Sequence, residues 1–153
     1  MTDSTHFPEG IPTKVRLGDQ LCFALYAATN AVTRTYRPLL DDIGITYPQY
    51  LVLLVLWEHR RETIGGIGNH LHLPAHAISP IIDRLEARGL VERSTDPDDA
   101  RRVLVELTST GSELETRAAA AWHEVRCRTL MNQSELSEMR TQLLNLIDRM
   151  TPP

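Results

Sequence analysis

The chain has 153 residues, the length of a single domain, and 42% of them are hydrophobic, so it can form a core and is not wholly disordered. Sixteen basic against twenty acidic residues give a formal net charge of −4, so bulk charge offers no support for nucleic-acid binding. There is no apolar run of about 18 residues to span a membrane, and the first twenty residues carry no secretory signal. We therefore expect a cytoplasmic protein without a membrane partner.

The N-terminal part of the chain divides into an arm and a helix. Residues 1–16 are interrupted by proline and glycine and have no apolar periodicity, so they predict an N-terminal arm. From 17 to 36 the apolar spacing predicts a helix with one buried stripe of Leu21, Leu25, Ala28 and Val32. Pro38 is expected to end or kink this helix, before a short helical piece from Leu39 to about Ile43.

Three further helices are predicted before residue 89. Thr46 followed by Tyr47-Pro48 is typical of a helix start, so the apolar stretch 50–57 is interpreted as a helix rather than a buried strand. Residues 64–71 have helical spacing but contain three glycines, each costing up to about 1 kcal/mol, and should form the least stable helix. Residues 74–88 predict a helix that begins at Pro74 and ends before Gly89.

The pattern then changes to short strands. The runs 90–93 and 103–107 are typical of β-structure, and the turn-rich stretch 94–99 between them predicts a hairpin with a charged tip. Thr110 and Glu113 fit a capping box that opens a helix to about Leu130. Ser134 is expected to cap a last helix.

This order of elements indicates a mainly α protein with a small β-hairpin, a winged helix-turn-helix between N- and C-terminal dimerisation helices. The helix 74–88 would enter the major groove, and the hairpin tip with Arg101 and Arg102 would follow the adjacent backbone or minor groove. The alternative is a plain α+β domain whose hairpin caps a core. Between residues 74 and 105 five arginines face six carboxylates, a poor electrostatic footprint for DNA.

The flanking helices indicate a dimer. Residues 17–45 and 109–150 have no obvious partner within so small a core, so we expect them to interlock with a second copy of the chain. Residues 46–108 would then form the DNA-binding lobe. A two-fold symmetric homodimer suits a palindromic double-stranded operator.

The two cysteines need an explanation, because a structural disulfide is not expected in a reducing compartment. Cys22 lies on the first predicted helix, and three tyrosines, Tyr26, Tyr36 and Tyr47, are candidates to donate hydrogen bonds to its thiolate. Cys127 follows 105 residues later and could resolve a sulfenic acid at Cys22 by forming a disulfide. Ordinary packing of these residues remains the alternative.

Specific runs of sequence resemble the organic-hydroperoxide-sensing repressors of the MarR family. The resemblance rests on residues 20–28, on Tyr36-Arg37-Pro38 and on Tyr47-Pro48-Gln49-Tyr50, while Asp99-Ala100-Arg101-Arg102 resembles the wider family. It implies a homodimeric repressor in which an organic hydroperoxide oxidises Cys22. Tyr26, Tyr36 and Tyr47 would line the thiol pocket, and Cys127 of the partner subunit would form the final disulfide, as in the two-cysteine branch.

The resemblance also implies the DNA-contacting residues, and here the chain departs from the family. The recognition helix would use Ala75, His76, Ala77, Ser79 and Arg84, and the wing would use Asp99, Arg101 and Arg102. Small hydroxyl and glycine residues are usual where Ala75-His76-Ala77 stand, and lysine is frequent at Asp83; the preceding helix has glycines instead of charges. We expect an altered operator or a low intrinsic affinity.

Three rival functions remain open. The histidines His59, His70, His72 and His76 suggest a metal sensor, although no cysteine or carboxylate pair completes a tetrahedral set. A regulator of the same fold that binds a small aromatic ligand would leave Cys22 passive. A thiol peroxidase-like enzyme lacks support, because the sequence has no Cys-x-x-Cys motif and no activating Arg or His adjacent to Cys22. We predict no catalytic site, no bound metal and no cofactor.

Overall fold

The computed structural model describes residues 14–151, so the predicted arm over residues 1–16 lies almost wholly outside it. No helix of the described part is long and apolar enough to cross a membrane. The elements, in chain order, are η1 (Leu17–Asp19), α1 (Leu21–Asp41), α2 (Tyr47–His59), β1 (Arg61–Thr63), α3 (Ile64–Leu71), α4 (Ala75–Ala87), β2 (Val91–Thr95), β3 (Val103–Leu107), α5 (Ser109–Arg128) and α6 (Gln133–Met150).

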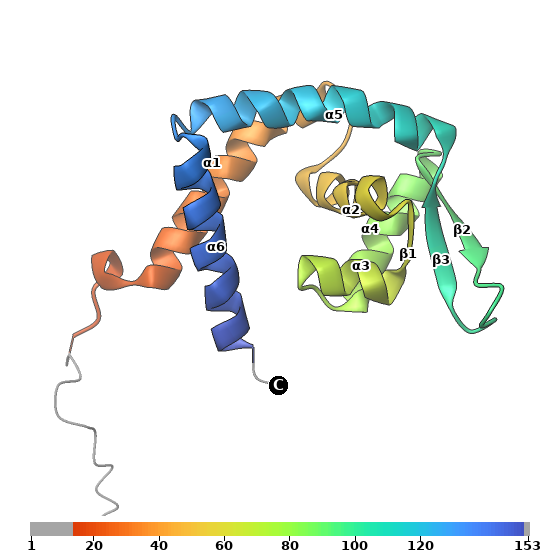
Figure 1. The fold of residues 1–153 in the computed structure, drawn as a ribbon, viewed down its shortest axis with the longest axis horizontal. Coiled ribbons are helices and arrows are strands. Elements are labelled where there is room, and N and C mark those ends of the chain that lie inside the picture. Colours follow the sequence, from red (N-terminus) through yellow and green to blue (C-terminus); the bar gives the residue numbers. More distant parts are fainter. Residues whose placement is uncertain (1–13, 152–153) are drawn as a thin grey trace, which may run out of the picture.

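Helix α5 connects two parts of the molecule (Figure 1). At its beginning it covers a lobe made of α2, α3, α4 and the three strands, and at its end it meets α1 and turns into α6. The mainly helical winged helix-turn-helix architecture expected from the sequence is confirmed. The hairpin β2–β3 projects from the lobe beside the helix pair α3–α4.

The sheet has one strand more than the sequence predicted. Its order is β1-β3-β2, and both pairs are antiparallel, with Val91 opposite Leu107 and Arg61 opposite Glu106. β1 was missed because three residues are too few to display an alternating pattern. It ties the end of α2 to the wing, so the hairpin is anchored in the lobe.

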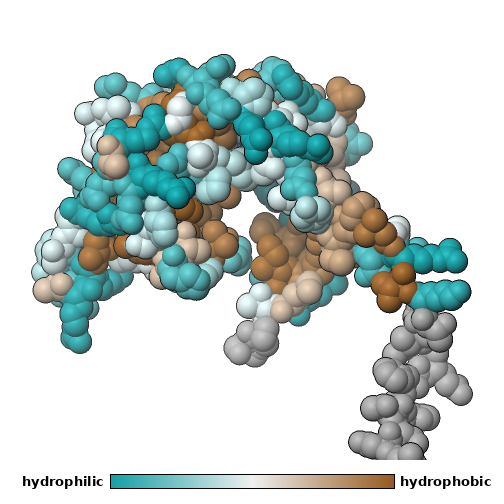
Figure 2. Space-filling model, turned by 180° about the vertical axis from the view of Figure 1, so that it is seen from behind, coloured by the Kyte–Doolittle hydropathy of each residue, from teal (hydrophilic) through white to brown (hydrophobic). Residues whose placement is uncertain are grey.

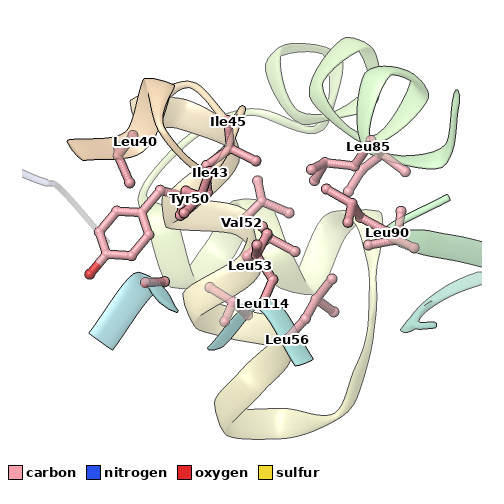
Figure 3. Packing of buried hydrophobic residues seen from close by; sticks show 14 of the residues in the cluster. Leu40, Ile43, Ile45, Tyr50, Val52, Leu53, Leu56, Leu85, Leu90 and Leu114 are labelled. Atoms are coloured by element: carbon pink, nitrogen blue, oxygen red, sulfur yellow. The ribbon is translucent and has the colours of Figure 1, made fainter. Parts of the chain in front are cut away.

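The core packs around α2, with side chains from α4 and α5 meeting those of α2 (Figure 3). Leu53 and Leu56 of α2 are fully buried and pack with Leu85, Leu90 and Leu114. Burying each such leucine contributes about 1.5–3 kcal/mol, so this cluster fixes the lobe against the first half of α5. α2 is a helix as predicted: the Thr46 hydroxyl accepts a hydrogen bond from the Gln49 N–H (3.4 Å), and the Gln49 side chain accepts from the Thr46 N–H (2.8 Å).

The first helix differs from its prediction in two respects. Pro38 does not end it: α1 runs on to Asp41, because proline removes only one backbone donor and Leu40, just beyond, is anchored in the core at 1% exposure. The stripe expected to be buried is open in the single chain, with Leu21 59% and Val32 39% exposed. Only Tyr36 and Leu40 of α1 are buried.

Both C-terminal helices begin two residues earlier than expected. Thr108, not Thr110, caps α5: its hydroxyl accepts from the Gly111 N–H (3.0 Å) and donates to the Gly89 carbonyl (2.6 Å). Asn132, not Ser134, caps α6 through a reciprocal box with Glu135. The sequence offered a Ser, Thr or Asn both at the observed cap and two residues later. The contact with Gly89 selects Thr108, and the local box with Glu135 selects Asn132.

Candidate functional site

An aromatic cluster lies where α1, α2 and α5 meet. The ring of Tyr36 is 5.3 Å from those of Tyr47 and Tyr50, and Tyr50 is 6.3 Å from Trp57, measured between centroids. Tyr36 and Tyr50 are buried, and Tyr47 is half-buried. The structure thus brings together two of the three predicted pocket tyrosines, and adds Tyr50, which sequence reasoning did not select. Its position three residues after Tyr47, on the same helical face, was the available signal.

The phenols of this cluster stay protonated over the physiological range. Burial raises the pKa of Tyr36, Tyr47 and Tyr50 above the ordinary tyrosine value. For Tyr36 the neighbouring phenols of Tyr50 and Tyr47 add to the effect of burial. Protonated phenols are hydrogen-bond donors, which is the property required of partners for a thiolate.

Cys22 and Tyr26 lie away from this cluster in the single chain. Cys22 is exposed in the first turn of α1, and among residues 14–151 the Gln20 side chain, 4.0 Å from its sulfur, is its one side-chain hydrogen-bond partner. Tyr26 is 68% exposed. Tyr36 follows Cys22 by fourteen residues on one continuous helix, which separates them by about 21 Å at a rise of 1.5 Å per residue. The predicted pocket is therefore incomplete within one chain.

Cys127 lies in the last turn of α5 and is also exposed. Its sulfur is 3.8 Å from Nδ1 of His123, one turn earlier on the same helix. Val125 and Thr129, two residues before and after Cys127, line one pocket with Val32 and Tyr36, so this end of α5 lies beside the middle of α1 rather than beside the turn that carries Cys22. Cys127 itself is on the other side of α5 from these two residues, because positions two apart on a helix face in different directions. No disulfide joins the two cysteines.

Two hollows adjoin the aromatic cluster. One, of about 440 Å³, lies between α2 and α5 and is walled by the tyrosines together with Leu54, Trp57 and Trp122, with the carboxylates of Glu58 and Glu115 at its margin. The other, of about 330 Å³, lies between α1, α5 and α6 and includes Arg126 and Arg140. Tyr36, Tyr47 and Trp122 form walls of both.

The predicted recognition residues occupy the exposed start of α4. Ala75 and His76 are exposed, Ala77 and Ser79 are half-buried, and Arg84 is exposed two turns further on. Arg84 pairs with no carboxylate among residues 14–151, so its charge is available to a phosphate. Pro80, inside α4, leaves the His76 carbonyl without its usual intrahelical donor.

The tip of the wing is organised by its own carboxylates. Asp99 accepts a hydrogen bond from the Arg101 backbone N–H (3.0 Å) and lies 3.6 Å from Nε of that side chain, which is 94% exposed. Asp96 accepts from the Asp98 N–H (2.9 Å) and lies 3.8 Å from Nε of Arg102. At 3.6 Å the Asp99 carboxylate forms an ion pair with the Arg101 guanidinium but no side-chain hydrogen bond.

A second arginine joins the wing to α4. Nη2 of Arg93 on β2 donates to Asp83 at 2.6 Å, Nη1 donates to Glu86, and the Arg93 backbone N–H also donates to Glu86 at 3.2 Å. Burial works against the charge of Arg93, but the hydrogen bonds to Asp83 and Glu86 outweigh it and raise its pKa. Two carboxylates that would repel DNA are therefore neutralised within the lobe.

The four predicted histidines do not converge on one point. His59 and His70 stack at 4.4 Å between ring centroids, and Nε2 of His70 lies 3.8 Å from Glu62. His72 caps α3 in the left-handed conformation, and His76 is an exposed residue of the next helix, α4. Within residues 14–151 no three His, Cys, Asp or Glu side chains are grouped so that they could hold a metal ion.

The helix pair α3–α4 with its wing defines a class of DNA-binding regulators, and comparison with known proteins identifies the family. The MarR family model matches residues 45–103. The chain is 37% identical to the organic hydroperoxide resistance transcriptional regulator of Bacillus subtilis, over 88% of this chain and 91% of that one. It is 41% identical to the transcriptional regulator TtmR of Methylorubrum extorquens, over 88% and 69% respectively.

Among solved structures, AbfR of Staphylococcus epidermidis is similar in several states. Reduced AbfR bound to DNA superposes with a TM-score of 0.72 at 32% identity, covering 89% of this chain and 94% of that one. The disulfide form superposes less well, with a TM-score of 0.61 at 34% identity, covering 86% and 93%. The chain belongs to the MarR family and is a DNA-binding transcription regulator, not an enzyme.

Proposed function

We propose that the chain is a homodimeric repressor that senses organic hydroperoxides. A peroxide oxidises Cys22 to a sulfenic acid, Cys127 of the partner subunit converts it into a disulfide, and the dimer leaves its palindromic operator in the cytoplasm. The identity to the B. subtilis regulator supports the peroxide as inducer. The existence of a disulfide form of AbfR supports the two-cysteine route.

The observation that carries this proposal is a separation within one chain. Cys22 lies at the start of the long helix α1, and Tyr36, the member of the protonated tyrosine cluster on the same helix, lies near its end. Because α1 keeps them about 21 Å apart, the pocket can be completed only by a second chain whose Cys22 approaches Tyr36 and Tyr47. The exposed apolar stripe between them supplies a surface for that chain. The sensing thiol would therefore lie among phenols of the partner, which favour the thiolate as hydrogen-bond donors.

The conformation described is consistent with the reduced, DNA-bound state. It is more similar to reduced AbfR on DNA than to disulfide-linked AbfR. An overoxidised AbfR has also been solved bound to DNA, with a TM-score of 0.72. By analogy, oxidation of Cys22 alone would leave this regulator on its operator, and the disulfide with Cys127 would release it.

Non-reducing electrophoresis and intact mass after one equivalent of cumene hydroperoxide test the proposal. The wild-type chain should form a covalent dimer, and neither Cys22→Ser nor Cys127→Ser should do so. In a gel shift with operator DNA, oxidised wild type should dissociate, while Cys127→Ser should gain oxygen at Cys22 and remain bound. A Cys22 that does not react with the peroxide would contradict the proposal.

The hollow of about 440 Å³ favours one second candidate, a regulator that binds a small aromatic ligand with a passive Cys22. Its tyrosine and tryptophan walls suit an aromatic ring, and Glu58 and Glu115 at the margin disfavour an anion. Cys22→Ser would then still release DNA on addition of such a ligand. Under the peroxide proposal the same variant responds to no inducer.

A further inference from the structure

The position of Cys127 makes its proposed reaction difficult without help. It lies in the last turn of α5, far from the amide groups of that helix's N-terminus. Activated cysteines occur instead at helix N-termini or beside cations. Since the thiolate is the form that attacks another sulfur, a neighbouring group must take the Cys127 proton.

The two arginines that flank Cys127 are occupied by other partners. Nη2 of Arg126 donates to the Gln133 side chain at 2.5 Å, and its guanidinium lies 5.5 Å from the centre of the Trp122 ring. Nε of Arg128 donates to Glu124 at 3.0 Å. Neither arginine makes a hydrogen bond to the thiol, and a guanidinium cannot accept a proton.

His123, unlike the two arginines, contacts the Cys127 thiol. Its Nδ1 is 3.8 Å from the Cys127 sulfur, at the i, i+4 spacing that brings side chains together on a helix face. Within residues 14–151 it forms no ion pair with a carboxylate, and it is the one side chain in hydrogen-bond contact with this thiol. In the tautomer protonated at Nε2, Nδ1 is a free acceptor directed at the S–H.

We propose that His123 is the general base that activates Cys127 for disulfide formation; this rests on the proposed function. The hydroperoxide first transfers an oxygen to the Cys22 thiolate of the partner subunit and leaves as an alcohol. Nδ1 of His123 then takes the Cys127 proton, and the resulting thiolate attacks the sulfenic sulfur. The S–S bond forms as the S–O bond breaks, and the departing hydroxide takes the proton from His123 to become water.

The two steps can be timed separately in the intact dimer. Trapping with dimedone measures sulfenic acid formation at Cys22, and non-reducing electrophoresis of quenched samples measures the disulfide. His123→Gln should leave the first rate unchanged and slow the second about tenfold at neutral pH, because exchange follows the thiolate fraction. The control is His59→Gln. This variant also loses an imidazole, but His59 neither contacts Cys127 nor belongs to the predicted DNA-contacting residues, so neither rate should change.

A structural role for His123 predicts different behaviour. If the imidazole acts as a base, adding free imidazole to His123→Ala should restore much of the lost rate, because the site is exposed. Raising the pH until the thiol ionises unaided should also abolish the difference from wild type. Equal disulfide rates in wild type and His123→Gln overturn this inference alone. A wild type that accumulates sulfenic acid without any disulfide overturns it together with the disulfide step.

Discussion

At the scale of single residues, Arg93 ties the wing to α4. Its side chain is 24% exposed and bonds two carboxylates of α4 from a position on β2, so one side chain joins the two elements that we expect to contact DNA. The guanidinium group of Arg101 does not join two elements in this way. It is anchored only by Asp99 within the described residues and extends into solvent, where a DNA backbone would lie.

This difference predicts that substituting Arg93 lowers the stability of the protein, whereas substituting Arg101 weakens DNA binding without lowering stability. Arg93→Gln leaves Asp83 and Glu86 without their cation and should lower the free energy of unfolding by about 1–2 kcal/mol, a modest value because both carboxylates are partly exposed. Arg101→Gln should weaken DNA binding with an unchanged denaturation midpoint. Urea denaturation and a gel shift on both variants check this; equal stability of the two would contradict it.

The tyrosine cluster predicts an alkaline limit to stability. The folded chain holds the protons of Tyr36, Tyr47 and Tyr50 more tightly than the unfolded chain, whose tyrosines ionise near pH 10. The free energy of unfolding is therefore unaffected by these groups below about pH 10 and falls as the pH rises above it. Tyrosinate absorbance should show these three phenols titrating late in the folded protein and together on unfolding. Tyr47→Phe should reduce the alkaline loss of stability.

At the scale of elements, the glycines of α3 separate into necessary and dispensable positions. A Cβ on Gly68 would lie 2.5 Å from the Leu73 carbonyl oxygen, because the turn into α4 folds back over this residue and Leu73 donates its N–H to the Gly68 carbonyl at 2.9 Å. A Cβ on Gly65 would meet nothing within 4 Å. The glycines that marked this helix as weak therefore have a packing reason at Gly68, against backbone, and at Gly66, where a Cβ would clash with the Glu62 side chain, but not at Gly65.

The two positions give a matched pair of substitutions with opposite signs. Gly68→Ala should destabilise the protein by about 1–3 kcal/mol through overpacking against backbone. Gly65→Ala should stabilise it by up to about 1 kcal/mol, since alanine is the better helix former and has room. Thermal unfolding of both variants measures this. Destabilisation by Gly65→Ala would show that α3 needs its glycines for another reason.

The elements also show what the sequence could and could not predict. α2 was predictable because its start, Thr46 with Gln49, is decided by neighbours in the chain. β1 was not, because a three-residue strand exists only through pairing with β3. Thr108 was preferred over the nearby candidate Thr110 through its contact with Gly89, 19 residues away, whereas the Asn132 cap rests on a local box with Glu135 that the sequence already contained. Of the site, Tyr36 and Tyr47 were named but Tyr50 was not. The gap between Cys22 and Tyr36 was also missed, although the helical rise implies it.

At the scale of the whole molecule, the single chain exposes too much apolar surface. Apolar surface gathers beside the hollow that separates the two parts of the molecule (Figure 2). No residue of α6 is buried in the single chain. Three large apolar side chains on one face of this helix, Met139, Leu143 and Leu144, are 40–50% exposed. Surfaces of this kind mark interaction sites, here for a second copy of the chain.

Charges on this face should separate the subunits. Leu143→Glu combined with Leu144→Glu should give a monomer in analytical ultracentrifugation that still folds, because neither leucine belongs to the core. The monomer should also bind the operator more weakly than the dimer, since a single subunit contacts one half-site and makes only part of the phosphate contacts. Val103→Glu, at a similar exposure on the wing, should leave the mass unchanged. A dimeric double variant would place the interface elsewhere.

Helix α5 gives this arrangement a mechanical consequence. Its first turn is fastened to the lobe, through Thr108 to the Gly89 carbonyl and through the Trp57 indole to the Gly111 carbonyl (3.0 Å), and its last turn carries Cys127. Twenty residues make it a rod about 30 Å long, so a 10° tilt imposed at the thiol end moves the wing end by about 5 Å. Two such levers, pulled by two disulfides, would change the separation of the recognition helices by a large part of a groove width. Disulfide bonds of ordinary length would thus move the recognition helices too far for both to stay in their half-sites on the DNA.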